Sequence, residues 1–232
     1  MIQAGHVSLN GAVRCSPESP VHLERDRIEV DGHVVRAHEL VYLAMNKPRG
    51  LITTASDEKG RDTIYSLIEK TGTPWLAPVG RLDKASEGLL LLTNDSEWGA
   101  RLASPGSHLD KTYHVQIDRI ATADEIDSLV QGVRQDGELL RAKRVRLLRA
   151  GAKNCWLEIV LDEGRNRQIR RIIGSLGIEV LRLVRVAIGT LALGNLAKGM
   201  TRPLSREEKA SIDRASQQHP ENAAKPARPK SA

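Results

Sequence analysis

The sequence predicts an α+β fold in which a mixed, mainly antiparallel central sheet is flanked by helices. Apolar residues alternate along several short segments, for example at Tyr113, Val115 and Ile117, as is typical of strands with one buried face. Short connections separate these segments, which argues against repeated βαβ units. The 232 residues, 40% of them hydrophobic, suffice for one sizeable core and a small additional unit.

Turn-forming residues divide residues 1–36 into short β-prone pieces, including His6–Leu9 and Arg27–Val30. Turns this closely spaced leave no room for an independent core. We therefore expect a small appendage over residues 1–36 and a main domain over residues 41–214. A disordered tail is expected over residues 215–232, because its Gln, Pro, Ala and Lys residues show no apolar periodicity.

The main domain opens with two candidate strands, Val41–Met45 and Leu51–Thr54, on either side of a turn at Lys47–Gly50. Four consecutive leucines, Leu89–Leu92, predict a strand that is buried on both faces. A later strand is expected where Leu157–Leu161 alternates apolar residues on one side.

Three helix starts can be recognised. Capping boxes, in which a hydroxyl caps the third amide and a Glu reaches back, occur at Thr122–Glu125 and Ser205–Glu208. A third helix is expected over Asn166–Leu176, with Asn166 as its N-cap and Gly177 as its C-terminal stop.

This third helix has an apolar face and an arginine face. At about 100° per residue, its isoleucines fall within one arc, and the opposite arc holds Arg167, Arg170 and Arg171. Gly174 is on the arginine side, where a missing side chain would let another backbone approach. A solvated basic face would explain the pattern. Three flanking arginines favour a phosphate-binding surface instead: Arg165, Arg182 and Arg185.

Positive charge is concentrated in one part of the chain. The net charge is +6, yet residues 141–185 hold twelve Lys or Arg against four Asp or Glu. Concentrated positive charge favours a polyanion, because each neutralised phosphate releases a counterion. Nucleic acid is therefore the expected partner. With three Trp, three Tyr and no Phe, modules that stack successive bases on aromatic platforms are disfavoured.

Other classes of protein lack the residues they need. The apolar runs are far shorter than the roughly 18 residues that span a bilayer, and no signal-peptide pattern is present, so no membrane association is expected. Cys15 and Cys155 are the only cysteines, which predicts neither a disulfide framework nor a metal site. No phosphate-binding or dinucleotide fingerprint is found either. We expect a monomer in a reducing cytoplasm.

A charged, glycine-rich loop, Gly80–Gly88, precedes the leucine strand and presents Asp83. A loop that leads into a buried strand must be held in one shape, so Asp83 has rigid support. Between Arg81 and Lys84, this side chain could simply be an ion-pair member. A carboxylate flanked by cations also stays ionised, however, and can act as a base or nucleophile.

Four motifs resemble those of RNA pseudouridine synthases and follow that family's order. Lys47–Gly50 matches the family's first motif, and Gly80–Asp83 with Ser86–Leu90 and Thr93–Asp95 matches its signature loop. Lys111–Tyr113 matches the tyrosine motif, and Glu163–Arg171 matches the third motif. The resemblance extends over residues 41–212. The branch resembled modifies small-subunit or large-subunit ribosomal RNA, and the sequence leaves the target uridine and its RNA, transfer RNA included, open.

The resemblance implies isomerisation of a uridine to pseudouridine without a cofactor, since the two differ only in the base atom bonded to ribose. It implies that Asp83 starts the reaction, either as a nucleophile at the anomeric carbon or as a base on the neighbouring ribose carbon. Tyr113 would help to remove the proton at carbon 5. Arg170 would pair with Asp83 and keep that buried carboxylate charged.

The target base must leave its stack, which costs a few kcal/mol that RNA contacts elsewhere must offset. The candidates for these contacts are Lys47, Arg81, Arg144, Arg146, Arg165, Arg167 and Arg171. A non-catalytic RNA-binding or ribosome-associated protein is the alternative, and the complete Asp83 loop argues against it. A DNA-binding regulator is not expected, because no helix-turn-helix with a dimer seam is recognisable.

The segment Ile2–Gly32 resembles the second half of an alpha-L RNA-binding module, which this branch often carries at its N-terminus. Gly5–Gly11 and Ile28–Gly32 carry the resemblance. The helical pair of the first half does not precede them in this sequence. Two interpretations follow: a truncated module with a weakened grip on RNA, or a true start that lies upstream.

Overall fold

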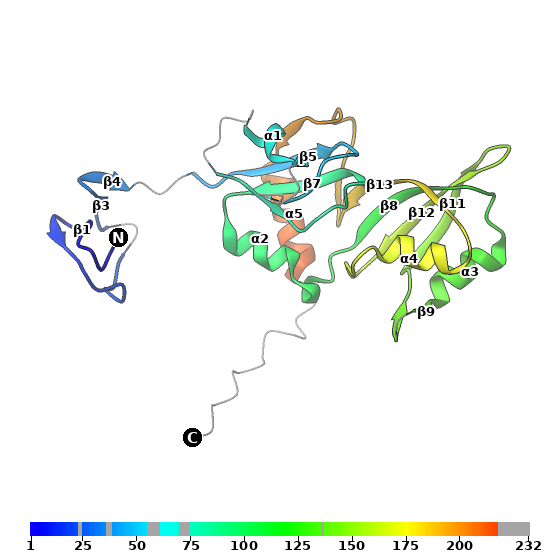
Figure 1. Ribbon diagram of the computed structural model, residues 1–232, viewed down its shortest axis with the longest axis horizontal. Helices are drawn as coiled ribbons and strands as arrows, with labels where there is room; N and C mark the ends of the chain where they lie inside the picture. Colours follow the sequence, from blue (N-terminus) through cyan, green and yellow to red (C-terminus); the bar gives the residue numbers. More distant parts are fainter. Residues whose placement is uncertain (23–24, 36–38, 55–60, 70–74, 136, 218–232) are drawn as a thin grey trace, which may run out of the picture. The chain divides into compact units, whose positions relative to one another are not determined.

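The computed structural model describes residues 1–22, 25–35, 39–54, 61–69, 75–135 and 137–217. It divides into two compact units, Met1–Leu40 and Val41–Ala232 (Figure 1). From residue 218 onward, the predicted tail lies outside the described residues.

The first unit is a four-stranded antiparallel sheet in the order β2-β1-β3-β4. The strands are β1 Val7–Leu9, β2 Ala12–Val13, β3 Ile28–Val30 and β4 His33–Val35. Asn10-Gly11 and Asp31-Gly32 join two of its hairpins with positive φ at both residues, the conformation that a two-residue hairpin turn requires. Leu9 is the one buried residue among those described in this unit, so the unit has almost no core of its own.

The second unit is built on a nine-stranded sheet in the order β11-β12-β8-β13-β7-β5-β15, with β6 beside β7 and β14 beside β13. Its strands are β5 Tyr42–Lys47, β6 Ala77–Val79, β7 Glu87–Thr93, β8 Lys111–Ile117, β11 Arg144–Ala150, β12 Cys155–Leu161, β13 Val180–Ile188, β14 Leu191–Ala192 and β15 Thr201–Pro203. Among the pairings between the described strands, only β7–β13 is parallel, so the predicted mixed, mainly antiparallel sheet is confirmed. A separate hairpin joins β9 Val133–Gln135 to β10 Glu138–Leu140.

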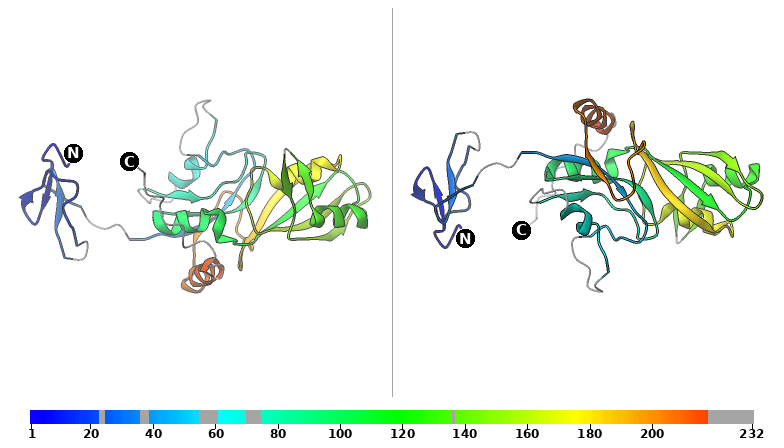
Figure 2. Two further views of the ribbon diagram at one scale, coloured as in Figure 1. Left: turned by 90° about the horizontal axis from the view of Figure 1, so that it is seen from below. Right: turned by 90° about the horizontal axis from the view of Figure 1, so that it is seen from above.

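Helices cover both faces of this sheet. They are α1 Tyr65–Ile68, α2 Ser96–Ala103, α3 Ala123–Gln131, α4 Gln168–Ser175 and α5 Arg206–Gln217, with a short 3-10 turn, η2 Pro105–Ser107. On one face α3 and α4 enclose one core, and α1 encloses the next, with Tyr113 packed against both. On the other face α2 and α5 enclose a third core. Figure 2 shows α5 on the side of the sheet opposite α1 and α4.

The leucine strand is buried on both faces, as predicted. Leu89 and Leu91 belong to the core under α2 and α5, whereas Leu90 and Leu92 belong to the core under α1. β7 therefore lies between two helical layers at the centre of the unit. The loop that precedes β7 is therefore attached to a strand whose residues are all buried.

Both predicted capping boxes form. The Glu125 amide donates to Thr122 Oγ1 at 3.2 Å, and the Thr122 amide donates to the Glu125 carboxylate at 2.9 Å. The same reciprocal pair joins Ser205 and Glu208 at 3.1 and 2.9 Å. These signals are local, so the sequence alone was enough to find them.

The predicted start of the third helix is wrong. α4 begins at Gln168, and its N-cap is Arg167, with φ 49° and no side-chain cap. Gln168 instead organises the approach to the helix, because its Oε1 accepts from the Arg165 amide at 3.2 Å. The C-terminal stop is confirmed, since the Gly177 amide donates to the Gly174 carbonyl and Gly177 has a φ of +69°. The close backbone expected at Gly174 is absent, because no described residue outside its own helix comes within 4 Å of the point that a Cβ would occupy.

Three further sequence expectations can be compared with the structure. Leu51–Thr54 is not a strand, since only Ile52 forms an isolated bridge, to Thr63. None of the described helices is long and apolar enough to cross a membrane. In the described ranges, no group of three His, Cys, Asp or Glu side chains is arranged to hold a metal ion.

Candidate active site

Asp83 stands in the loop between β6 and β7, and its side chain is 38% exposed. The loop is fixed from two sides. Thr53 Oγ1 donates to the Leu82 carbonyl at 2.8 Å and accepts from the Leu82 amide at 3.3 Å. The Ser86 amide donates to the Asp83 carbonyl at 3.0 Å. The backbone of Asp83 is thus held while its carboxylate faces solvent.

Lys47 is the internal support of this loop and not an RNA contact, which corrects the sequence prediction. Its side chain is fully buried, and Nζ donates to the carbonyls of Pro48, Asp83 and Ser86 at 3.1, 3.2 and 2.9 Å. Burial lowers the pKa of Lys47 to about 8, against the opposing attraction of Asp83. An ammonium group enclosed by three carbonyls has no surface to offer a phosphate.

Gly88 lets the loop approach the strand that carries the other half of the site. Gly88 of β7 is level with Arg185 of β13 in the parallel pairing. A Cβ at Gly88 would come within 2.3 Å of the Arg185 carbonyl oxygen, and φ is +105°, so only glycine fits. Arg185 is in turn level with Tyr113 on β8. Asp83 and Tyr113 are therefore brought to one region by three adjacent strands.

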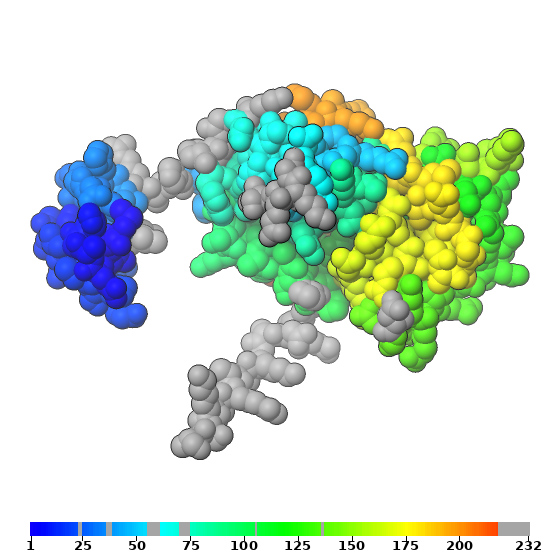
Figure 3. All heavy atoms as spheres, viewed as in Figure 1, coloured from blue at the N-terminus to red at the C-terminus, as the bar shows by residue number. Residues whose placement is uncertain are grey.

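A cavity of about 960 Å³ is lined by six of the predicted site residues: Arg81, Asp83, Tyr113, Arg165, Arg167 and Arg170. Its walls are the β6–β7 loop, β8, the segment before α4 and α4 itself. The surface is hollowed between the yellow α4 region and the neighbouring cyan-to-green segments (Figure 3). We call this cavity the cleft. It is large enough for a nucleotide.

The ion-pair partner of Asp83 is Arg167 and not Arg170. Arg167 Nη1 lies 3.5 Å from Asp83 Oδ2. Arg170 instead donates to two backbone carbonyls, from Nη1 to Val180 at 3.2 Å and from Nη2 to Ala85 at 3.1 Å. Burial lowers the pKa of Arg170, helped by Arg167, while Asp83 opposes the shift. Arg170 therefore joins the Asp83 loop to β13, and Arg167 supplies the nearest positive charge.

Comparison with known proteins shows the family. Residues 41–175 match the family model described as RNA pseudouridylate synthase. The chain belongs to this family. It is 36% identical over 216 residues to an Aquifex aeolicus protein named "Uncharacterized RNA pseudouridine synthase", covering 93% of this chain and 86% of that protein.

Two further matches agree. "Ribosomal large subunit pseudouridine synthase B" of Bacillus subtilis is 36% identical over 226 residues, covering 96% of this chain and 91% of that protein. A solved structure described as a pseudouridylate synthase matches with a TM-score of 0.67 and 30% identity, over 91% of this chain and 90% of that one. The predicted family, fold class and isomerase activity are confirmed, and the non-catalytic alternative is set aside.

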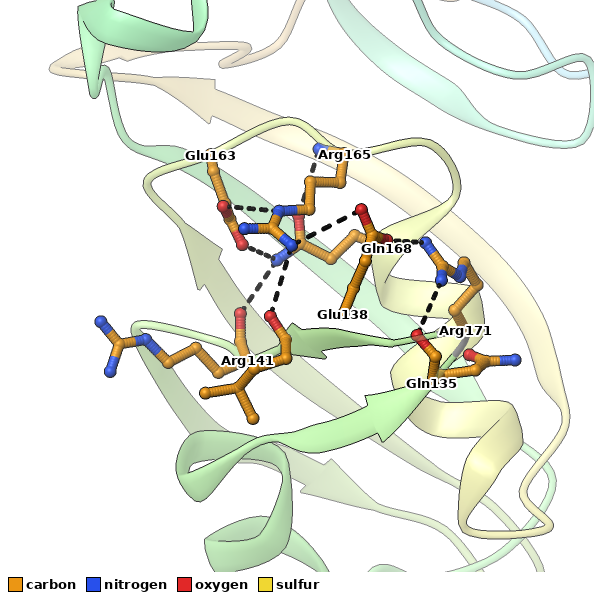
Figure 4. A network of polar contacts seen from close by, with 8 residues as sticks. Gln135, Glu138, Arg141, Glu163, Arg165, Gln168 and Arg171 are labelled. Atoms are coloured by element: carbon orange, nitrogen blue, oxygen red, sulfur yellow. Dashed lines mark hydrogen bonds and ion pairs between the residues drawn. The ribbon is translucent and has the colours of Figure 1, made fainter.

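In this synthase, a polar network holds the segment that leads into α4 (Figure 4). Glu163 accepts from Arg165 Nε at 2.9 Å and from Gln168 Nε2 at 2.8 Å. Gln168 Nε2 also donates to the Arg141 carbonyl at 3.0 Å. Arg165 is thereby oriented at the rim of the cleft with 40% of its side chain exposed.

Besides Lys47, three predicted RNA contacts of the synthase lie outside the cleft. Arg171 bonds to Glu138 at 2.9 Å and to the Gln135 carbonyl at 3.4 Å, so it ties α4 to the β9–β10 hairpin. Arg144 and Arg146 lie on β11 and pair with Glu158 at 3.4 and 2.7 Å. Strand alternation turns these two side chains to the face of the sheet opposite α4.

Four basic residues that line the cleft were not singled out as site residues: Arg61, Lys84, Lys111 and Arg185. Arg185, expected on a phosphate-binding surface, is only 5% exposed; its Nε donates to the Leu89 carbonyl at 2.7 Å, and its buried Nη2 has no hydrogen-bond partner among the described residues. Lys111 also lines the cleft, and burial lowers its pKa to about 8. Strand alternation could have indicated that Arg185 is buried, because it lies two residues after the inward-facing Leu183 and therefore on the same face of the strand.

Proposed function

We propose that this synthase isomerises a uridine of ribosomal RNA and that Asp83 starts the reaction. The observation that carries the proposal is the setting of Asp83. Its accessible carboxylate stands on a loop held by hydrogen bonds and lies 3.5 Å from Arg167. Asp83 and Tyr113 line the same cleft. A pre-formed carboxylate of this kind needs no rearrangement before it meets the ribose.

The atoms balance without an oxidant, a reductant or an energy source. The bond between the anomeric carbon and N1 of uracil breaks, and a bond from the same carbon to C5 forms. N1 gains a proton and C5 loses one. Asp83 acts first, as a nucleophile at the anomeric carbon or as a base on the neighbouring ribose carbon, and Tyr113 assists removal of the C5 proton. Arg170 acts as a positioning residue, because its contacts are with backbone carbonyls.

The cleft arginines suit contacts to the phosphates around the target nucleotide. Arg81, Arg165 and Arg167 line it, and the last two keep 40% and 50% of their side chains exposed. Ribosomal RNA is supported as the substrate by the name of the Bacillus subtilis relative. We also propose a monomer, since a single chain supplies Asp83, Tyr113 and the cleft arginines together. We also propose a reducing cytoplasm as the setting, because two cysteines, Cys15 and Cys155, do not make a disulfide framework.

Single-turnover assays on ribosomal RNA transcripts test the role of Asp83. Asp83→Asn keeps the shape of the side chain and removes its nucleophilicity, so we expect a loss of roughly hundredfold or more, with RNA affinity largely retained. Asp118→Asn is a matched control, since Asp118 is 36% exposed and lies 3.6 Å from Arg119 outside the cleft. An Asp83→Asn enzyme with more than about a tenth of the wild-type rate would refute the assignment.

A further inference from the structure

The face of the sheet opposite α4 carries a second group of basic residues. Strands β11, β12, β8 and β13 direct one set of side chains into the core under α3 and α4. The alternating side chains of these strands point to the opposite face of the sheet. On that face the described helices α2 and α5 cover only the half around β5, β6 and β7. We call this uncovered set the rear face; it consists of His114, Arg144, Arg146, Arg149, Trp156, Glu158 and Arg182.

Two buried carboxylates orient the cations of the rear face. Glu158 accepts from Arg146 Nε at 2.7 Å and Nη2 at 3.0 Å, and also from Arg144 at 3.4 Å. Glu87 pairs with Arg182 and, at 2.7 Å, with Lys198. Each carboxylate is shared by two cations, so each group keeps one uncompensated positive charge. Arg144 and Arg146 are still 65% and 61% exposed.

Trp156 lies at the centre of this face between further guanidinium groups. The Cζ atoms of Arg149 and Arg182 lie 5.1 and 5.7 Å from its ring centroid. A pocket of about 300 Å³ is lined by these three residues together with His114, Leu148, Val184 and Val186. Arg149 has no acidic partner among the described residues. A hollow lined by apolar side chains together with guanidinium groups suits a nucleotide, whose base is apolar on its faces and whose phosphate is anionic.

We infer that the rear face binds a second segment of the same RNA whose target uridine lies in the cleft. This inference rests on the proposed function. β11 is the outermost strand of the sheet, so RNA can pass from one face to the other around an edge that no further described strand covers. A protein partner is less favoured, because three uncompensated positive charges match a polyphosphate better than the mixed charge of an average protein surface.

The test uses two double variants of the full chain that remove the same charge. Arg144→Gln with Arg149→Gln alters the rear face and leaves Arg146 on Glu158. Arg206→Gln with Arg214→Gln is the control, since both arginines are exposed on α5. The probe is an in vitro transcript of large-subunit ribosomal RNA, with affinity measured over a salt series. Thermal unfolding checks that both variants are folded.

We expect the rear-face variant to bind at least tenfold more weakly near physiological salt. Its slope of log affinity against log salt should fall by about 1.4 to 1.8, which corresponds to two phosphate contacts, while the control changes neither quantity. If the rear-face variant binds the RNA as tightly as the control variant, the inference is overturned. A protein partner later found to need this face would not restore it. Ultraviolet crosslinking of the wild-type complex gives independent evidence, with crosslinks expected in the peptide that contains Trp156.

The two proposals can fail separately. Absence of pseudouridine in every ribosomal RNA tested with the wild-type enzyme would refute the proposed substrate while leaving the affinity measurement meaningful. Normal turnover with unchanged rear-face affinity would refute only the rear-face inference.

Discussion

Arg167 and Arg170 are three residues apart, yet they relate differently to Asp83. Arg167 precedes α4, is 50% exposed and forms the ion pair with the carboxylate. Arg170 is half-buried and donates to the backbone carbonyls of Val180 on β13 and Ala85 in the β6–β7 loop. Charge near the carboxylate and rigidity of the loop are therefore supplied by separate side chains.

This difference predicts separable effects of two alanine substitutions. Arg167→Ala should lower the single-turnover rate by tenfold or more at little cost in stability, because exposed ion pairs contribute about 0–1 kcal/mol. Arg170→Ala should lower both the rate and the stability, the latter by about 1–3 kcal/mol, since the Ala85 and Val180 carbonyls lose their donor. Rates at saturating RNA and urea unfolding measure the two effects. Equal rate and stability losses in both variants would contradict this division.

Lys47 predicts a pH dependence of stability. Its pKa is lowered from 10.5 to about 8 in the folded protein. Between these values the unfolded chain binds more protons than the folded one, so this residue's contribution to stability rises with pH. The unfolding free energy of wild type, relative to that of Lys47→Met, should therefore rise from pH 8 to pH 10 in urea titrations. Lys111→Met should behave alike, since its pKa is also lowered to about 8. A constant difference would show that Lys47 is not desolvated.

At the scale of elements, the approach of β7 to β13 depends on one glycine. Gly88→Ala would place a methyl group 2.3 Å from the Arg185 carbonyl at a φ of +105°. Because backbone must shift, we expect a loss of about 3 kcal/mol or more and loss of activity. Gly174→Ala in α4 is the control, since its Cβ would meet no other group within 4 Å, and helix propensity predicts a gain of up to about 1 kcal/mol. Urea unfolding of both variants decides; a neutral Gly88→Ala would refute the close approach.

The elements that sequence predicted correctly are those with local causes. The capping box at Thr122 needs only residues three apart, and Leu89–Leu92 is apolar enough to be buried on either face. Leu51–Thr54 failed as a strand because Ile52 finds only a single bridge partner. The start of α4 was misplaced because Gln168 bonds to Arg141, 27 residues earlier in the chain.

The site shows the same limit. Asp83 and Tyr113 could be nominated from motifs, and the structure brings both to one cleft. The roles of Lys47 and Arg170 depend on carbonyls of Asp83, Ser86 and Ala85, which only the folded loop turns toward them. A basic residue count cannot distinguish an internal ammonium from a phosphate contact.

At the scale of the whole molecule, the distribution of charge separates the two units. Residues 1–40 hold four Arg and six Asp or Glu and no Lys, whereas the second unit carries the basic excess. In the first unit, Arg27 pairs with Glu29 at 2.6 Å and His6 with Asp31 at 2.6 Å. Arg27 is therefore committed to an internal partner, and the acidic excess of this unit is a poor match for a polyanion.

This distribution predicts that the first unit contributes little to RNA binding. Removing residues 1–40 should weaken affinity for ribosomal RNA by about fivefold or less, equivalent to about 1 kcal/mol, and should leave the saturated single-turnover rate unchanged. It should also leave the main unfolding transition in place, because Leu9 is the one buried residue among those described in that unit and the large cores lie within Val41–Ala232. Binding titrations and calorimetry on the shortened chain measure all three quantities. A loss of roughly hundredfold in affinity would show instead that this acidic sheet presents a specific RNA site, for which backbone amides and the hairpin turns at Gly11 and Gly32 would have to replace the missing positive charge.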